Sequence, residues 1–231
     1  SSIHADQWVP LNIGTDAAFA LSMAEVIVEE KLYKTEFIVE QTDLPFLVRL
    51  DDEKFLRESD LARNGADDVF YVYDTVGDRV VEAPRRSLDL EGIVPALEGV
   101  FEVETTAGTV KVTTVFERLK RQLERYTPEL AQTTTGVSPE VVRALARRIA
   151  KARGCLNITQ TNFGKFYHGM EIERSILLVF ALAGHFGRPF GVGLHQADVE
   201  RFHGRKPLLF AEVAFRIDPV RREDQLLDVP G

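Results

Sequence analysis

The first group of residues whose types and spacing could do chemistry is Gly14, Thr15 and Asp16. A strand-like segment, residues 8–11, precedes them, and apolar residues then recur at helical spacing. Gly14 permits a positive φ at a turn, and Thr15 or Asp16 can accept hydrogen bonds from the first free amides of the helix. A strand, a glycine turn and a helix N-terminus favour binding of an anionic group. An ordinary strand-to-helix connection with a good cap would use the same residues.

A second polar group follows residues 155–159, which we expect to form a short buried strand. Its members are Gln160, Thr161, Asn162, Lys165, Tyr167 and His168. Ligands of open α/β sheets bind beyond the carboxyl ends of the strands, so this group is a candidate binding site. In a buried pocket Lys165 can donate hydrogen bonds or a proton. The simpler interpretation makes Lys165 a surface lysine and His168 the cap of the next helix.

That next helix, expected at residues 171–183, is apolar nearly all round and should therefore be buried. It ends in a glycine-rich loop that contains Gly184, Gly187, Gly191 and Gly193. The three later histidines, His185, His195 and His203, have no neighbouring metal ligands in the sequence, so we interpret them as structural and expect no metal site.

Composition limits the classes of function. The formal net charge of −8 and the pI of about 5.2 argue against a nucleic-acid partner. The one cysteine, Cys155, excludes an internal disulfide framework and any all-cysteine zinc or iron–sulfur site within this chain. The longest apolar run, residues 176–183, is too short to span a bilayer, so no direct membrane insertion is expected. The polar N-terminus predicts no signal peptide and leaves the compartment open.

The changing periodicity along the chain predicts an α/β fold with a β-rich insertion. We expect helices at residues 15–32, 139–153 and 171–183 to pack on short parallel strands. Between them we expect antiparallel hairpins at residues 69–82 and 101–114, followed by a helix at residues 115–126. A polar linker at residues 133–136 marks the best boundary. The predicted segments are the end of a dinucleotide-binding α/β domain (1–42), the insertion (43–132), a second α/β segment with the glycine-rich loop (133–193) and an unassigned tail (194–231).

Two stretches resemble a known family. ADQWVPLNIGTDAAFALSMAEVIVEEKLY, residues 5–33, is similar to the segment that follows the third strand of a dinucleotide-binding domain in molybdopterin oxidoreductases, the dimethyl sulfoxide reductase superfamily. The later stretch has Asn162, Tyr167 and His168 before the buried helix and the glycine loop after it, as in the same family. The nearest branch contains respiratory nitrate reductase, selenate and perchlorate reductases, and ethylbenzene dehydrogenase. Phe190 and Val192 stand where glycines are common in that loop.

This resemblance implies that the chain is a fragment of a catalytic subunit. It implies a molybdenum cofactor, molybdopterin guanine dinucleotide, held by Gly14, Thr15, Asp16, Asn162, His168, Gly184 and Gly187. Lys165 and His168 become the implied catalytic residues, and an iron–sulfur cluster is implied outside this chain. The implied reaction is oxygen-atom transfer or hydroxylation in anaerobic respiration. Partners would be the rest of the catalytic subunit and an iron–sulfur electron-transfer subunit, on the periplasmic or cytoplasmic face of a membrane. The fragment alone should carry no redox chemistry.

Two other classes of function remain open. A Rossmann-like nucleotide-binding enzyme without molybdenum would carry a Gly-x-Gly-x-x-Gly turn at the start of a helix, and this sequence has none. An interaction module would instead use the hairpin insertion to dock an electron-transfer subunit.

Overall fold

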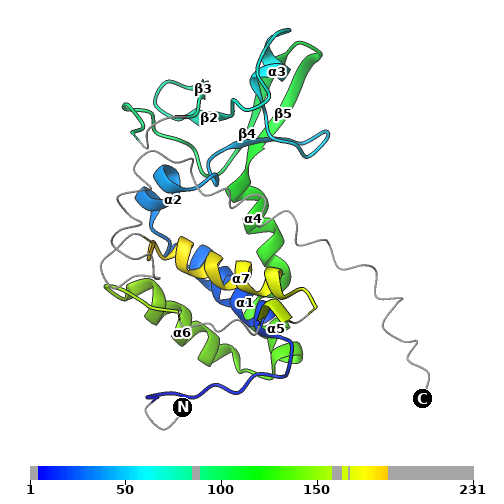
Figure 1. Ribbon diagram of the computed structural model, residues 1–231. Helices are drawn as coiled ribbons and strands as arrows, with labels where there is room; N and C mark the ends of the chain where they lie inside the picture. Colours follow the sequence, from blue (N-terminus) through cyan, green and yellow to red (C-terminus); the bar gives the residue numbers. More distant parts are fainter. Residues whose placement is uncertain (1–4, 85–88, 158–162, 166, 187–231) are drawn as a thin grey trace, which may run out of the picture.

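The computed structural model describes residues 5–84, 89–157, 163–165 and 167–186. A helical part carries a β-rich part at one end, and helix α4 (Val115–Leu123) runs from the sheet into the helices (Figure 1). The helical part contains α1 (Asp16–Glu29), α2 (Thr35–Gln41), α5 (Pro128–Thr135), α6 (Pro139–Lys151) and α7 (Gly169–Leu182), with single 3₁₀ turns at η2 (Glu124–Tyr126) and η3 (Phe163–Lys165). The β-rich part contains β1 (Leu47–Arg49), α3 (Glu58–Leu61), β2 (Tyr71–Asp74), β3 (Arg79–Glu82), β4 (Val100–Thr105) and β5 (Gly108–Thr114).

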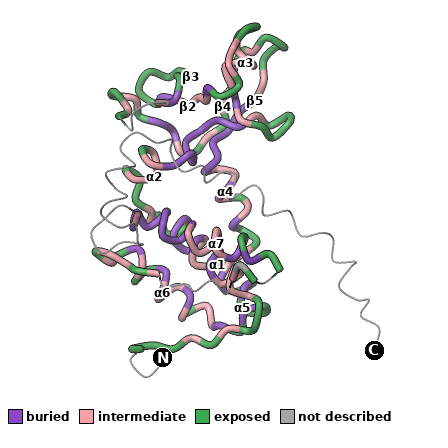
Figure 2. Tube along the Cα trace, viewed as in Figure 1, coloured by how far each residue is buried: buried purple, intermediate pink, exposed green. Residues whose placement is uncertain are grey.

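Helix α1 is the centre of the helical part and packs against α4, α5, α6 and α7. Its interior positions are apolar or small on every side, which suits a helix surrounded by other helices. Seven of its residues are buried: Ala20, Leu21, Ser22, Ala24, Val26, Ile27 and Val28. Burial is concentrated in α1, in α7 and at the junction of the sheet with α4 (Figure 2).

Helices α1, α6 and α7 run parallel to one another (Figure 1). The amide of Lys34, just beyond the end of α1, donates to the carbonyl of Leu182 at the end of α7 over 2.9 Å. Arg147, near the end of α6, donates two hydrogen bonds of 2.8 and 2.7 Å to the carboxylate of Glu30 at the end of α1. Since their C-terminal ends meet and the helices have 14, 13 and 14 residues, their N-terminal ends lie at the same side of the helical part.

The β-rich part is built from antiparallel pairs. One sheet has the order β1-β5-β4, and the second is the β2-β3 hairpin. A small core of Leu47, Leu56, Val103 and Val112 lies against the three-stranded sheet. The buried carboxylate of Asp74 accepts hydrogen bonds from the amides of Val76, Gly77 and Val94, which ties the hairpin turn to the returning chain and lowers the pKa of Asp74.

The mixed helix and strand content expected from the sequence is confirmed. The three long helices and the two hairpins form within a few residues of the expected bounds. None of the described helices is long and apolar enough to cross a membrane.

The strand expected at residues 8–11 is wrong, and the described part of the strand expected at residues 155–159 is not a strand. Residues 8–11 and 155–157 are irregular, with Trp8 73% exposed, and all five strands of the described residues pair antiparallel. A strand needs a neighbouring strand to satisfy its backbone groups, and neither segment has one within the described residues.

The expected linker at residues 133–136 is also wrong. Thr133 and Thr135 belong to α5, which begins with Thr127 as cap and Pro128 at its first position and ends at Gly136 with φ 75°. The polar threonines that suggested a linker donate their hydroxyls to carbonyls of their own helix.

We predict that Phe116→Ala lowers the free energy of unfolding by about 3–5 kcal/mol, because it removes a fully buried ring at the junction of sheet and helices. The ring of Tyr33 packs edge-on against it at 5.0 Å between centroids. Leu130→Ala is the matched control, since Leu130 is 55% exposed and should cost less than about 0.5 kcal/mol. Urea unfolding measures both, and equal losses would contradict this account of the core.

Candidate functional site

The turn before α1 is fixed by its contacts with α5. The amide of Asn12 donates to the carbonyl of Thr135 over 3.0 Å, and its side-chain amide donates to the carbonyl of Thr134 over 2.8 Å. Gly14 then adopts φ 81°, and a Cβ there would meet no atom within 4 Å. The turn is therefore anchored on one side and open on the other.

The start of α1 has no side-chain cap. Thr15 occupies the cap position, but its hydroxyl donates to the carbonyl of Asn12 over 2.8 Å and accepts nothing from the helix. The expectation that Thr15 or Asp16 caps the first amides is therefore wrong. The first backbone hydrogen bond of the helix runs from the amide of Phe19 to the carbonyl of Thr15. The amides of residues 16–18 therefore have no backbone acceptor among the described residues. These N–H groups, with the positive end of the helix dipole, remain available to an anion.

The start of α7 is similarly open. His168 occupies the cap position with φ 58°, and its side chain forms no cap hydrogen bond. Its Nδ1 lies 3.8 Å from a carboxylate oxygen of Glu171, and its side chain is 60% exposed. Tyr167 packs edge-on against the imidazole and is 89% exposed, and Lys165, at the end of η3, is also exposed.

Parallel packing brings these two openings together. Because α1 and α7 start at the same side, Gly14, Thr15 and Asp16 lie at the same end of the helix pair as Lys165 and His168 (Figure 1). The positive ends of two helix dipoles therefore point toward the same side. Asn162, the other expected member of this group, lies outside the described residues.

Gly184 lies at the opposite end of α7, which has 14 residues and so spans about 21 Å. It has φ 66°, and a Cβ on it would come within 2.9 Å of Cβ and Cγ of Lys34. Helix termination and this close approach require glycine here without any ligand. Gly187 lies outside the described residues.

His185 follows at this same end and is 1% exposed. Its Nε2 lies 2.8 Å from the carbonyl oxygen of Ile149, near the end of α6, so the ring joins the C-terminal ends of α6 and α7. This agrees with its interpretation as a structural residue. Across the described part of the chain, no three His, Cys, Asp or Glu side chains gather in a way that could hold a metal ion.

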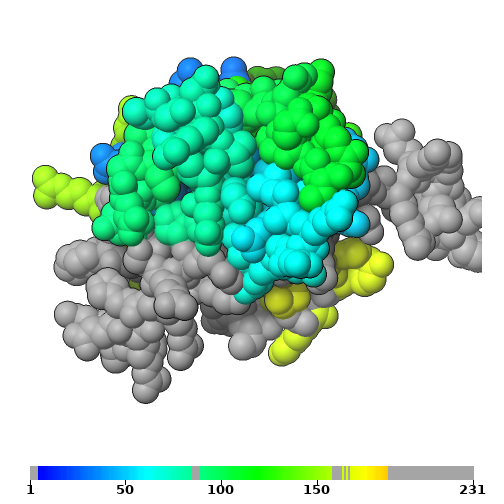
Figure 3. Space-filling view, turned by 90° about the horizontal axis from the view of Figure 1, so that it is seen from above, coloured from blue at the N-terminus to red at the C-terminus, as the bar shows by residue number. Residues whose placement is uncertain are grey.

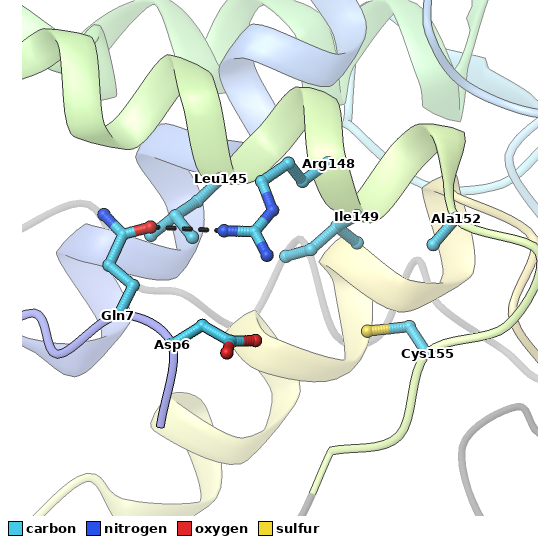
Figure 4. Close-up of a pocket in the computed structure, with 7 residues that line it drawn as sticks. All are labelled: Asp6, Gln7, Leu145, Arg148, Ile149, Ala152 and Cys155. Carbon is cyan, nitrogen blue, oxygen red and sulfur yellow. Dashed lines mark hydrogen bonds between the residues drawn. The ribbon is translucent and has the colours of Figure 1, made fainter. Parts of the chain in front are cut away.

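A groove of about 400 Å³ separates α6 from the N-terminal segment (Figure 4). Its lining residues are Asp6, Gln7, Leu145, Arg148, Ile149, Ala152 and Cys155. The guanidinium of Arg148 donates to the Gln7 side-chain oxygen over 3.3 Å across the groove. Burial raises the pKa of the Cys155 thiol, which makes it a poor nucleophile at neutral pH. No sequence pattern marks this groove, because its two sides lie about 140 residues apart in the chain.

A group of charges joins α1, α5 and α6. Arg147 pairs with Glu30 and lowers the pKa of that carboxyl, and Arg143 pairs with Glu129 over 2.7 Å. Glu25 lies half-buried among them. Burial, followed by repulsion from Glu29, raises the pKa of Glu25 from 4.5 to about 7. Sequence spacing gave no signal for this residue, since the shift depends on carboxylates from two helices.

Comparison with known proteins finds similar chains, although no family model matches. The chain is 47% identical to the chlorate reductase subunit alpha of Ideonella dechloratans over 193 residues, which cover 81% of this chain and 21% of that protein. It is 42% identical to the dimethylsulfide dehydrogenase subunit alpha of Rhodovulum sulfidophilum, covering 83% of this chain and 21% of that protein. It is 35% identical to the respiratory nitrate reductase subunit alpha of Haloferax mediterranei, covering 91% of this chain and 23% of that protein. The chain thus spans about a fifth of the length of these relatives.

We predict that Gly184→Ala lowers the free energy of unfolding by about 2–4 kcal/mol, through strain at positive φ and overlap with Lys34. Gly14→Ala is the control for φ alone, because no atom opposes its added Cβ, and it should cost about 1–2 kcal/mol. Urea unfolding of both variants decides the point. If the two losses are equal, the close approach of α2 does not explain why residue 184 is glycine.

We predict that Glu25→Gln stabilises the protein above pH 7 and leaves it unchanged below about pH 4.5. The folded state keeps its proton up to about pH 7, whereas the unfolded state loses it near pH 4.5, so this carboxyl costs stability as the pH rises through that window. The gain should reach at most about 1 kcal/mol, because solvent screens a half-exposed group.

Thermal unfolding across this pH range measures the difference between Glu25→Gln and the native chain. Glu36→Gln, on the exposed side of α2, serves as the control for removing one carboxylate from the surface. A gain for Glu25→Gln that is the same at low and high pH would show that the effect is not ionisation.

Proposed function

Because the chain belongs to the molybdopterin oxidoreductase superfamily, also called the dimethyl sulfoxide reductase superfamily, we propose that it holds the pterin guanine dinucleotide cofactor within the catalytic subunit of such an enzyme. The names of its relatives describe reductases and dehydrogenases. Since the chain spans about a fifth of their length, the activity belongs to the whole protein, of which this chain supplies a part.

The observation that carries the proposal is the parallel packing of α1 and α7, which gathers Gly14, Thr15 and Asp16 at one end with Lys165 and His168. The fit to a dinucleotide rests on two features of that end. The amides of residues 16–18 have no backbone acceptor, and the space beside Gly14 allows a ligand to approach the backbone. Phosphate groups take such positions at helix N-termini.

Each side chain in this group has a distinct proposed role. A carboxylate repels phosphate, so Asp16 accepts hydrogen bonds from the guanine or ribose side of the dinucleotide. Lys165 and His168 donate hydrogen bonds or a proton on the substrate side, and Asn162 contacts the pterin. Gly184, at the far end of α7, is a further proposed contact of the cofactor, and so is Gly187. When bound, the molybdenum would supply oxygen-atom transfer or hydroxylation, with electrons passing through an iron–sulfur cluster held elsewhere in the protein.

We also propose that residues 1–42 and 133–193 belong to a dinucleotide-binding-like α/β domain, with residues 43–132 as an insertion. Neighbouring helices that run parallel are typical of proteins in which each helix is followed by a returning strand. No specific observation favours a nucleotide-binding enzyme without molybdenum.

The proposal predicts that Asp16→Ala in the whole protein lowers pterin content and that His168→Ala lowers activity per molybdenum atom. Arg121→Ala is the control, because this half-exposed α4 side chain makes only a long contact, of 3.5 Å, with Glu117. Pterin and molybdenum are measured chemically, and circular dichroism verifies the fold. If Asp16→Ala keeps full pterin occupancy, or His168→Ala keeps full activity per molybdenum and loses only thermal stability, these side chains serve the fold alone.

A further inference from the structure

The net negative charge of the chain is accounted for by one region. Residues 43–114 contain sixteen acidic and eight basic side chains, a formal charge of −8, which equals the formal net charge of all 231 residues. The rest of the chain is therefore balanced. Residues 43–114 form the β-rich part, and their hairpins and α3 make up most of the face seen in Figure 3. An excess of negative charge in this part favours a partner of opposite charge.

The same region has an open sheet edge at β4. The backbone groups of Lys111 and Val115 point toward β1. The carbonyl of Lys111 accepts a hydrogen bond from the amide of Leu50 over 2.9 Å, and the amide of Val115 donates to the carbonyl of Phe46 over 3.0 Å. Because these directions alternate along a strand, the even-numbered residues between them in β5 point their backbone groups toward β4. Val112, for example, pairs through its backbone with Phe101, its register partner in β4.

By the same alternation, the backbone groups of Val100, Glu102 and Glu104 point away from β5. β4 is the outer strand of its sheet, and within the described residues no backbone partner is present for these groups. The opposite edge differs, because residues 54–56 pair with β1 and cover it. An outer strand of six residues with unpaired amides and carbonyls is a template for a further strand.

The side chains along this edge indicate which strand fits. Glu102 and Glu104 are exposed and project from the same face of β4. On the paired side, β5 places Lys111 opposite Glu102, with 4.0 Å between the ammonium and the carboxylate. A second copy of this chain is a poor occupant, because two β4 edges in antiparallel pairing would set the carboxylates of one against those of the other.

We propose that the β4 edge binds an extended segment of a protein partner that carries Lys or Arg at alternate positions. Backbone hydrogen bonds to Val100, Glu102 and Glu104 hold the added strand in register, and its basic side chains pair with the two carboxylates. This surface is separate from the helix ends of the proposed cofactor site, so either proposal can fail without the other. The competing explanation is that the two glutamates only protect an edge from aggregation.

The test uses the whole protein and a fluorescent peptide, Thr-Lys-Val-Lys-Val-Lys-Val-Thr, with a matched peptide that has Glu in place of Lys. We expect the lysine peptide to bind, more weakly as salt rises, and to slow hydrogen exchange at the amides of Val100, Glu102 and Glu104. The glutamate peptide should not bind. If neither peptide binds, if both bind equally, or if these three amides stay unprotected, the proposal is wrong.

Variants separate backbone pairing from charge. Glu102→Gln with Glu104→Gln should weaken binding about fivefold, whereas Asp67→Asn with Glu91→Gln, which removes the same charge outside β4, should not. Glu102→Pro removes an outward amide without touching the ladder to β5, so it should abolish exchange protection while Glu102→Gln alone retains it. The proposal is overturned if the two double variants weaken binding equally, or if Glu102→Pro and Glu102→Gln have the same effect on exchange protection. Dimerisation of the protein through β4 would also overturn it.

Discussion

The structure depends on the packing of one helix, α1, against α6 and α7 in a common direction. Its interior residues are buried on every side, so the helix is stable only when neighbours cover all of them. Polar contacts then fix how the neighbours align. The Lys34 amide holds the end of α7, and Arg147 holds the end of α6. Alignment of the C-terminal ends places the N-terminal ends, with the turn at Gly14 and the start of α7, at the same side of the helical part.

The two ends of the helices differ in their contacts. At the C-terminal ends the contacts are made within the protein itself, as the fit of Gly184 against Lys34 and the contact of His185 Nε2 with the Ile149 carbonyl show. At the N-terminal ends no side chain caps α1 or α7, and the donors remain free. Uncapped helix starts cost stability in isolation, and α6, the third of the parallel helices, also begins without a side-chain cap.

Sequence periodicity was sufficient for elements whose backbone hydrogen bonds are local. The helical repeat located α1, α6 and α7, and the alternation around Gly77 and Gly108 located both hairpins. The prediction failed for two segments that were assigned from composition. Residues 8–11 have strand-forming composition but no neighbouring strand, and the threonines before Gly136 satisfy their hydroxyls within α5. In the candidate site, the turn at Gly14 could be predicted from the sequence. That Gly184 and His168 lie at opposite ends of α7, and so far apart, could not.

The helical part and the β-rich part favour different ligands, because their electrostatic interactions differ. The helical part offers donors and helix dipoles, which act over short distances and favour a bound anion. The β-rich part holds the whole net charge, which acts over longer distances and favours a basic partner. The Phe116 ring lies at their junction, so the two surfaces are held on one core. Because that core is shared, a partner that binds the sheet edge and a ligand that binds the helix ends are placed in a fixed relation by the same packing that stabilises the fold.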